Sequence, residues 1–134
     1  MKTILVPTSG TVTAVESAEY AIRVAKSLKA EIHVLHVVTE DKDVESMKES
    51  LRSFERAGEE SQVAVRGVTA VGNVIDQIID YAESNLVSLI LMGASNGSVV
   101  ERWLSHEVLA QTAVPVLVMP YQIFDSENDV DEVD

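Results

Sequence analysis

The sequence predicts an α/β fold, with a single doubly wound, five-stranded, mostly parallel sheet and helices on both faces. Five short apolar segments alternate along the chain with four longer segments in which apolar residues recur every three or four positions. Strands that alternate with helices need right-handed crossovers, which place the strands parallel in one sheet. The chain has 134 residues, a length that suits one domain with one core.

The first half of the chain supplies two strands and the helix between them. Residues 2–7 form a short apolar run that ends at Pro7 and a turn-forming segment, so we expect a buried strand there. A helix is expected from Thr13 onward, because small apolar residues recur at helical spacing. Its inward residues are Ala14, Ala18, Ala21, Ile22, Ala25 and Leu28. Residues 31–38 are apolar at nearly every position, as in an interior strand covered on both faces.

A second helix is expected over residues 39–60, with a stop at Gly58. Its apolar face consists of Val44, Met47, Leu51 and Phe54. The more open alternation of residues 61–68 predicts a strand nearer the sheet edge.

The remaining elements follow the same order. Gly72 and Asn73 precede a third helix, whose inward residues are Val74, Ile75, Ile78, Ile79 and Ala82. Residues 86–92 and 114–119 are expected to form the fourth and fifth strands, with a fourth helix over 98–112 between them.

Acidic residues divide the chain into two parts. The net charge is −12, and the last ten residues carry six acids and no base. Such a run is typical of a solvated, flexible tail, so we expect a folded domain over residues 1–120 and an acidic tail over 121–134. The acidity also argues against a nucleic-acid partner, which would need a basic face.

Composition excludes several kinds of chemistry. The chain has no cysteine and only three histidines, at positions 33, 36 and 106, which lack the spacing of a metal site. The longest apolar stretches are far shorter than the roughly 20 residues that span a bilayer, so no direct membrane insertion is expected. The first residues lack the features of a secretory signal, and a cytoplasmic location is therefore expected.

Two loops are the candidate ligand site. Ligands of doubly wound sheets bind at the carboxyl ends of the strands, where the strand order reverses. The first and fourth expected strands end in turns rich in glycine and serine, whose backbone amides can hold an anion. The candidate nucleotide-binding or phosphate-binding residues are Pro7, Thr8, Ser9, Gly93, Ser95, Asn96, Gly97 and Ser98. Ordinary helix capping is the alternative interpretation of the second turn.

The two strand histidines invite a simpler interpretation than catalysis. His36 is expected to form a core or strand-end hydrogen bond, and His33 to lie at the solvent end of its strand or against a helix. Neither Ser9 nor Ser98 has an evident base partner, so the sequence gives no support to nucleophilic catalysis.

Five segments in order and spacing resemble the universal stress protein (UspA) family. They are ILVPTSG at 4–10, AEIHVLHVV at 30–38, VGNVIDQIIDYAE at 71–83, LVSLILMGASNGS at 86–98 and VLAQTAVPVLVMP at 108–120. The resemblance covers residues 2–120 and implies a Rossmann-like fold that dimerises through its last strand. The residues of that strand are Val116, Leu117, Val118 and Met119. Some members of the family bind ATP and others do not.

The chain departs from the pattern of the ATP-binding members. Those members typically have an aspartate two residues after the proline of the first strand, and here that position is Ser9. Of their later glycine motif, Gly93 is kept, but Asn96 stands at the second glycine, with Gly97 one residue late. His106 and Glu107 stand at the final Gly-Ser pair, and a glutamate there would repel a triphosphate. The ATP motif is therefore divergent.

The sequence thus favours a non-enzymatic regulatory or protective module, homodimeric through its last strand, that acts on an unidentified protein partner and does not bind ATP in the family's usual manner. The alternative is a nucleotide-binding sensor in which the 93–98 loop holds ATP with magnesium, AMP or a cyclic dinucleotide. The chain would in that case also fit a soluble domain of a larger transporter or kinase.

Overall fold

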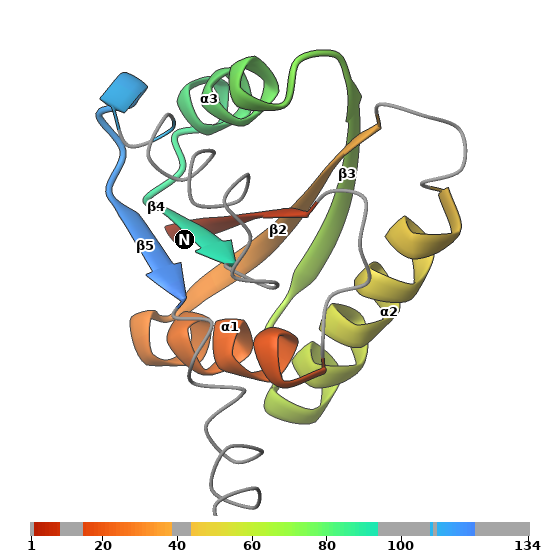
Figure 1. The fold of residues 1–134 in the computed structure, drawn as a ribbon. Coiled ribbons are helices and arrows are strands. Elements are labelled where there is room, and N and C mark those ends of the chain that lie inside the picture. Colours follow the sequence, from red (N-terminus) through yellow and green to blue (C-terminus); the bar gives the residue numbers. More distant parts are fainter. Residues whose placement is uncertain (1, 9–14, 39–43, 94–107, 109, 120–134) are drawn as a thin grey trace, which may run out of the picture.

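The protein forms one five-stranded parallel sheet with the strand order β3-β2-β1-β4-β5 (Figure 1). The structure is a computed structural model that describes residues 2–8, 15–38, 44–93, 108 and 110–119. The strands are β1 Lys2–Thr8, β2 Ala30–Val38, β3 Val65–Val71, β4 Leu89–Gly93 and β5 Val116–Met119. The helices are α1 Val15–Leu28, α2 Val44–Ser61 and α3 Val74–Ser84. The expected fold class is confirmed, and every strand pair is parallel.

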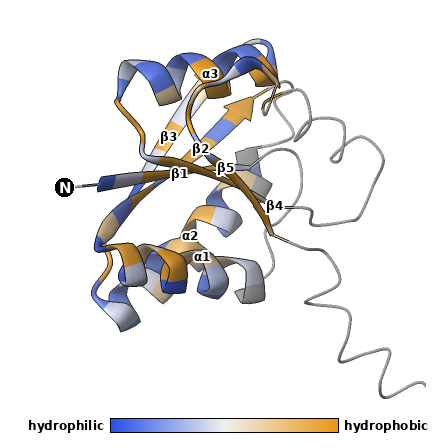
Figure 2. Ribbon diagram, turned by 90° about the vertical axis from the view of Figure 1, so that its left-hand side faces the viewer, coloured by the Kyte–Doolittle hydropathy of each residue, from blue (hydrophilic) through white to orange (hydrophobic). Residues whose placement is uncertain are grey.

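Helices cover the sheet from both sides, and each side has its own apolar cluster. Helices α1 and α2 pack on one face, and α3 packs on the other (Figures 1 and 2). Ile4 and Val6 of β1 face the first pair of helices, whereas Leu5 faces α3. This alternation follows from the two-residue period of a strand. None of the helices in the described part of the chain is long and apolar enough to cross a bilayer.

The small apolar face of α1 is confirmed, apart from its last residue. Ala18, Ala21, Ile22 and Ala25 are buried against the sheet and α2. Leu28 is exposed, because the helix ends there and the chain turns at Lys29 with a φ of 54°. The expectation that Leu28 points inward was therefore wrong, and Ala14 lies outside the described residues.

Gly58 does not end α2, which continues to Ser61. A Cβ atom at position 58 would lie 2.7 Å from the carbonyl oxygen of Val63 and 2.7 Å from Cγ2 of Val65. Glycine is thus required here by the close approach of the chain that leads into β3. The chain leaves the helix at Gln62, whose φ is 60°. The predicted stop at Gly58 was wrong because a tertiary contact explains the glycine.

β3 is an edge strand, as its open alternation predicted, but it begins at Val65 because α2 runs further than expected. In α3, the side chain of the N-cap residue Asn73 accepts a hydrogen bond from the backbone N–H of Asp76 at 3.1 Å. On α3 itself, Ile78 and Ala82 are fully buried against the sheet, whereas Ile79 is only partly buried.

The last two strands are shorter than predicted. Leu86 belongs to a turn, with a φ of 51° and 86% of its surface exposed, so β4 starts three residues later at Leu89. β5 occupies the other edge of the sheet beside β4. Val108, Ala110 and Gln111 are helical, and the predicted helix ends one residue early because Thr112 is not helical. Residues 98–107 and 109 lie outside the described residues.

Candidate functional site

The order of the strands reverses at β1, which lies between β2 and β4. Thr8, the last residue of β1, stands opposite His36 of β2. On the other side, Leu5 stands opposite Ile90, and three residues further on β1 ends at Thr8 and β4 ends at Gly93. The fold therefore brings Pro7, Thr8 and Gly93 to one edge of the sheet, where ligands of this architecture bind. The other five candidate residues, at positions 9 and 95–98, lie outside the described residues.

Thr8 and His36 form a polar pair at this edge. The Oγ1 atom of Thr8 lies 3.3 Å from Nδ1 of His36, and the tautomer of the ring decides which of the two donates. The imidazole is buried, with 2% of His36 exposed. The expected strand-end hydrogen bond of His36 is thus confirmed.

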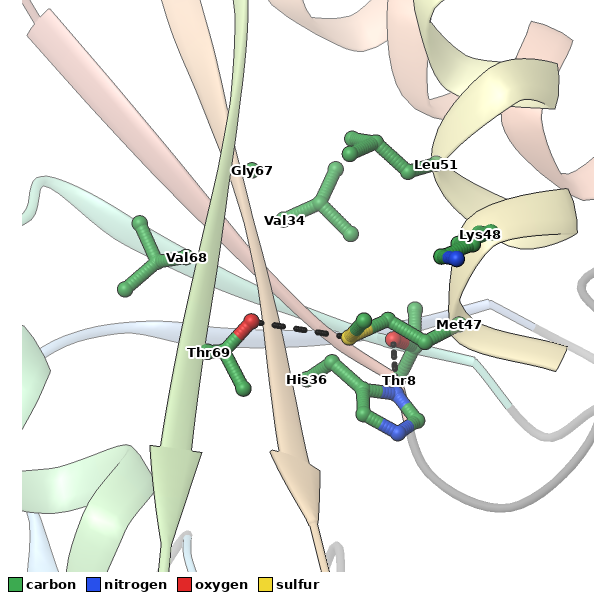
Figure 3. Close-up of a pocket in the computed structure, with 9 residues that line it drawn as sticks. All are labelled: Thr8, Val34, His36, Met47, Lys48, Leu51, Gly67, Val68 and Thr69. Carbon is green, nitrogen blue, oxygen red and sulfur yellow. Dashed lines mark hydrogen bonds between the residues drawn. The ribbon is translucent and has the colours of Figure 1, made fainter. Parts of the chain in front are cut away.

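A cavity of about 110 Å³ lies next to this pair, between α2 and the strands β1, β2 and β3 (Figure 3). Its polar lining consists of Thr8, His36, Thr69 and Lys48. Its apolar lining comes from β2, β3 and α2, including Val34, Met47, Leu51 and Val68. The site is therefore a mostly apolar slot with hydrogen-bonding groups grouped at one end.

Two contacts between α2 and β3 fix the walls of the cavity. The hydroxyl of Thr69 donates to Sδ of Met47 at 3.5 Å (Figure 3). A Cβ atom at Gly67 would lie 2.6 Å from Cδ2 of Leu51, so this glycine lets α2 approach the edge strand closely. Sequence reasoning placed Met47 and Leu51 in the core and assigned no role to Gly67 or Thr69. The glycine inside a strand pattern was the signal that could have found this contact.

Lys48 is the only cationic side chain among the described residues that line this cavity. Its ammonium lies 3.9 Å from Oε1 of Glu45, one helical turn earlier. The two side chains are 55% and 79% exposed. An ion pair that is this long and this exposed contributes at most about 1 kcal/mol.

A second polar cluster lies on the opposite face of the sheet, under α3. Nδ1 of His33 is 2.7 Å from the hydroxyl oxygen of Tyr81, and Nε2 is 3.0 Å from Oε1 of Glu31. The two rings meet edge to face, with centroids 5.9 Å apart. Burial raises the pKa of Tyr81, the positive charge of Arg66 opposes that rise, and Glu31 adds to it. His33 thus faces a helix, one of the two positions expected for it.

The two strand histidines are three positions apart, so they point to opposite faces of the sheet and cannot act on one ligand. Within the described ranges, no three histidine, cysteine, aspartate or glutamate side chains are grouped so that they could hold a metal ion. The chemistry available at the sheet edge is hydrogen bonding by Thr8, His36 and Thr69, apolar packing, and one ammonium group.

Fold and site together define a doubly wound α/β module with a small cavity between α2 and the strands β1, β2 and β3. The chain belongs to the universal stress protein family, whose family model matches residues 1–120. The expected membership is thereby confirmed.

Comparison with individual proteins agrees with this assignment. A universal stress protein of Methanocaldococcus jannaschii is 28% identical over 138 residues, which cover 88% of this chain and 81% of the relative. The crystal structure of a universal stress protein in complex with cAMP has a TM-score of 0.72 at 15% identity, and covers 90% of this chain and 97% of its own. The universal stress protein of Archaeoglobus fulgidus in complex with dAMP has a TM-score of 0.70 at 17% identity, with coverage of 90% and 98%. At these identities the two structures establish the common fold.

Proposed function

We propose that this protein is a non-enzymatic regulatory module that binds an adenosine monophosphate at the carboxyl edge of its sheet. The observation that carries the proposal is the cavity beside the Thr8–His36 pair, which reaches the carboxyl end of β1, the strand beside which the strand order reverses. Two proteins with the same fold hold cAMP and dAMP, and both ligands join adenine, a sugar and a single phosphate.

The size and lining of the cavity favour a base as the group inside it. Pockets that enclose a whole ligand measure about 300–1,000 Å³. A cavity of about 110 Å³ accepts only one planar group, which leaves the ribose and phosphate at its rim. Met47 and Leu51 offer apolar and polarisable contacts to the faces of a ring. The hydroxyls of Thr8 and Thr69 can donate to or accept from its edge.

The sequence after β4 favours a monophosphate over ATP. Amide groups hold a triphosphate where glycines let the backbone approach it. Asn96 replaces one glycine of the family's ATP motif, and Glu107 stands where its final serine or threonine is expected. Ser9 likewise replaces the aspartate that follows the first strand in ATP-binding members. We therefore propose that ATP is not bound in the family's usual manner.

The regulatory assignment rests on the chemistry of the cavity. None of the described residues that line it is a carboxylate, so a general base for hydrolysis would have to be His36 alone. The imidazole is buried and hydrogen-bonded to Thr8. These features favour binding over catalysis, and we propose that the module signals the presence of a nucleotide to a protein partner in the cytoplasm.

Isothermal titration calorimetry with adenosine, AMP, cAMP and magnesium ATP tests the proposal. AMP and cAMP should bind more tightly than magnesium ATP, and Met47→Phe should weaken both by about tenfold or more, because the ring fills the helix side of the cavity. Leu28→Phe is the matched control, since it adds the same ring at an exposed site on α1. Absence of binding at millimolar ligand would refute the proposal, as would equal losses in the two variants.

We further propose that two copies of the chain associate through β5. This strand is the open edge beside β4, and Leu117 and Val118 expose 39% and 42% of their surface. An apolar edge strand leaves backbone donors and acceptors that a second copy can pair. Val116 and Met119, in contrast, pack against the core clusters of their own chain.

A further inference from the structure

We propose that Lys48 of α2 holds the phosphate of the bound nucleotide, so that the second helix of this chain recognises the anion. The inference deepens the proposed function and rests on it. It assigns to α2 a role that the sequence suggested only for the loop after β4.

The position of Lys48 follows from the geometry of the cavity. Figure 3 shows its side chain on α2, above Met47 and across the cavity from β3. A base that fills the cavity leaves its ribose and phosphate outside, and Lys48 lies at that rim with 55% of its side chain exposed. A lysine ammonium has three donors on a flexible stem, so it can follow a phosphate as a point charge.

A local cation would offset the negative charge of the protein for an anionic ligand. The chain carries a net charge of −12, which opposes the approach of any anion. Around the cavity, Lys48 is the only described lining residue that offsets this field. Its present partner Glu45 lies 3.9 Å away in an exposed pair, which a phosphate can replace at little cost.

The loop after β4, the alternative anion site, departs in sequence from the family's ATP motif. Asn96 stands at one glycine position of the family's motif, and Glu107 adds a negative charge where a hydroxyl is expected. A lysine on α2 would supply the attraction that these substitutions remove.

Titration of the full chain with adenosine and AMP separates the role of Lys48 from that of the cavity. Lys48→Gln should lower the affinity for AMP by about tenfold, which is the typical effect of losing one charge-assisted hydrogen bond. Adenosine, which lacks the phosphate, should bind within about twofold of its original affinity. Glu45→Gln should strengthen AMP by about two- to threefold because it removes the competing carboxylate. The ratio of the affinities for AMP and adenosine should fall as the salt concentration rises, since the proposed contact of Lys48 with the phosphate is exposed.

Lys26→Gln is the matched control, because it removes one positive charge from an exposed helical site on α1. It should leave both affinities unchanged, and thermal unfolding should be the same for all three variants. Equal losses of AMP and adenosine in Lys48→Gln would overturn the inference by making the residue merely structural. An AMP affinity that is unchanged in Lys48→Gln would also overturn the inference and leave the proposed function intact. If the unaltered protein bound neither ligand, the proposed function itself would fall.

Discussion

The hydroxyl oxygen of Tyr81 on α3 lies 2.7 Å from Nδ1 of His33 on β2, although 48 residues separate them in the chain. The other ring nitrogen of His33 lies 3.0 Å from a carboxylate oxygen of Glu31. In neutral His33, Nε2 donates to Glu31 and Nδ1 accepts from Tyr81, so both ring nitrogens are hydrogen-bonded. This contact anchors α3 to the sheet on the face opposite the cavity.

Removal of the Tyr81 hydroxyl should destabilise the protein. Tyr81→Phe leaves Nδ1 of the buried His33 without its donor, which costs about 1–3 kcal/mol of unfolding free energy. Chemical denaturation measures the loss. Tyr20→Phe on α1 is the control and should change the unfolding free energy by less than about 0.5 kcal/mol. Equal effects in the two variants would show that the contact under α3 contributes nothing.

The same hydroxyl should make stability depend on alkaline pH. Burial is the main cause that raises the pKa of folded Tyr81 above its usual value of 10.0. The neutral phenol therefore stabilises the fold fully below the pKa of the unfolded chain, and this contribution is lost as pH rises through the folded pKa. The unfolding free energy of the unaltered protein minus that of Tyr81→Phe should fall as the pH rises above about 10. A difference that stays constant over this range would contradict the prediction.

Gly58→Ala should destabilise the protein although alanine favours helices. At a solvent-exposed helical position, glycine to alanine stabilises a protein by about 1 kcal/mol. Here the new Cβ would lie 2.7 Å from the backbone oxygen of Val63. Backbone cannot yield as a side chain does, and overpacking of this kind costs about 1–3 kcal/mol. Denaturation of Gly58→Ala beside the exposed control Glu59→Ala measures the difference. A more stable Gly58→Ala variant would restore the interpretation of this glycine as a simple helix stop.

Gly67→Ala should affect ligand binding more than stability. The new Cβ would lie 2.6 Å from Cδ2 of Leu51, a side-chain end that can rotate away. Since Leu51 lines the cavity, its displacement changes the space for a base, and we expect AMP affinity to fall by about fivefold or more. The unfolding free energy should change by less than about 1.5 kcal/mol. Calorimetry and denaturation of the same sample test both expectations, and unchanged affinity would place the ligand elsewhere.

Val118→Lys should convert the proposed dimer to a monomer. A charge on the exposed side of edge strand β5 opposes pairing with a second copy, while the fold keeps its core. Sedimentation velocity reports the change in mass. The control is Val71→Lys on the other edge strand, where the side chain is 76% exposed. A monomeric unaltered protein, or a dimer sensitive only to position 71, would contradict the assignment of β5.

The sequence predicted the fold because apolar residues recur at the spacing with which helices and strands bury one side. Ala18, Ala21 and Ala25 recur at helical spacing and are all buried. The run of apolar residues in β2 predicted an interior strand, and the open alternation near β3 predicted an edge. Errors arose where an element meets a turn. Leu28 and Leu86 are apolar and adjoin periodic segments, yet both are exposed because the chain reverses beside or at them with positive φ.

The sequence predicted one part of the candidate site, the strand ends, but not the cavity. Strand ends are local features, and parallel strands end at one edge, so Thr8 and Gly93 could be placed together from sequence. The cavity itself could not be foreseen, because Met47, Lys48 and Leu51 belong to a helix whose position over the sheet is set by its contact with Gly67.

The sequence by itself determined the order of the described elements, their parallel arrangement and most of the buried faces, since these depend on residue type and spacing. Only the tertiary structure decided that Gly58 is a packing position, that His33 pairs with Tyr81, and that α2 forms one wall of the cavity. The physical reason is that periodicity records which side of an element is buried. The partner it is buried against depends on close packing between segments that the chain brings together only when it folds.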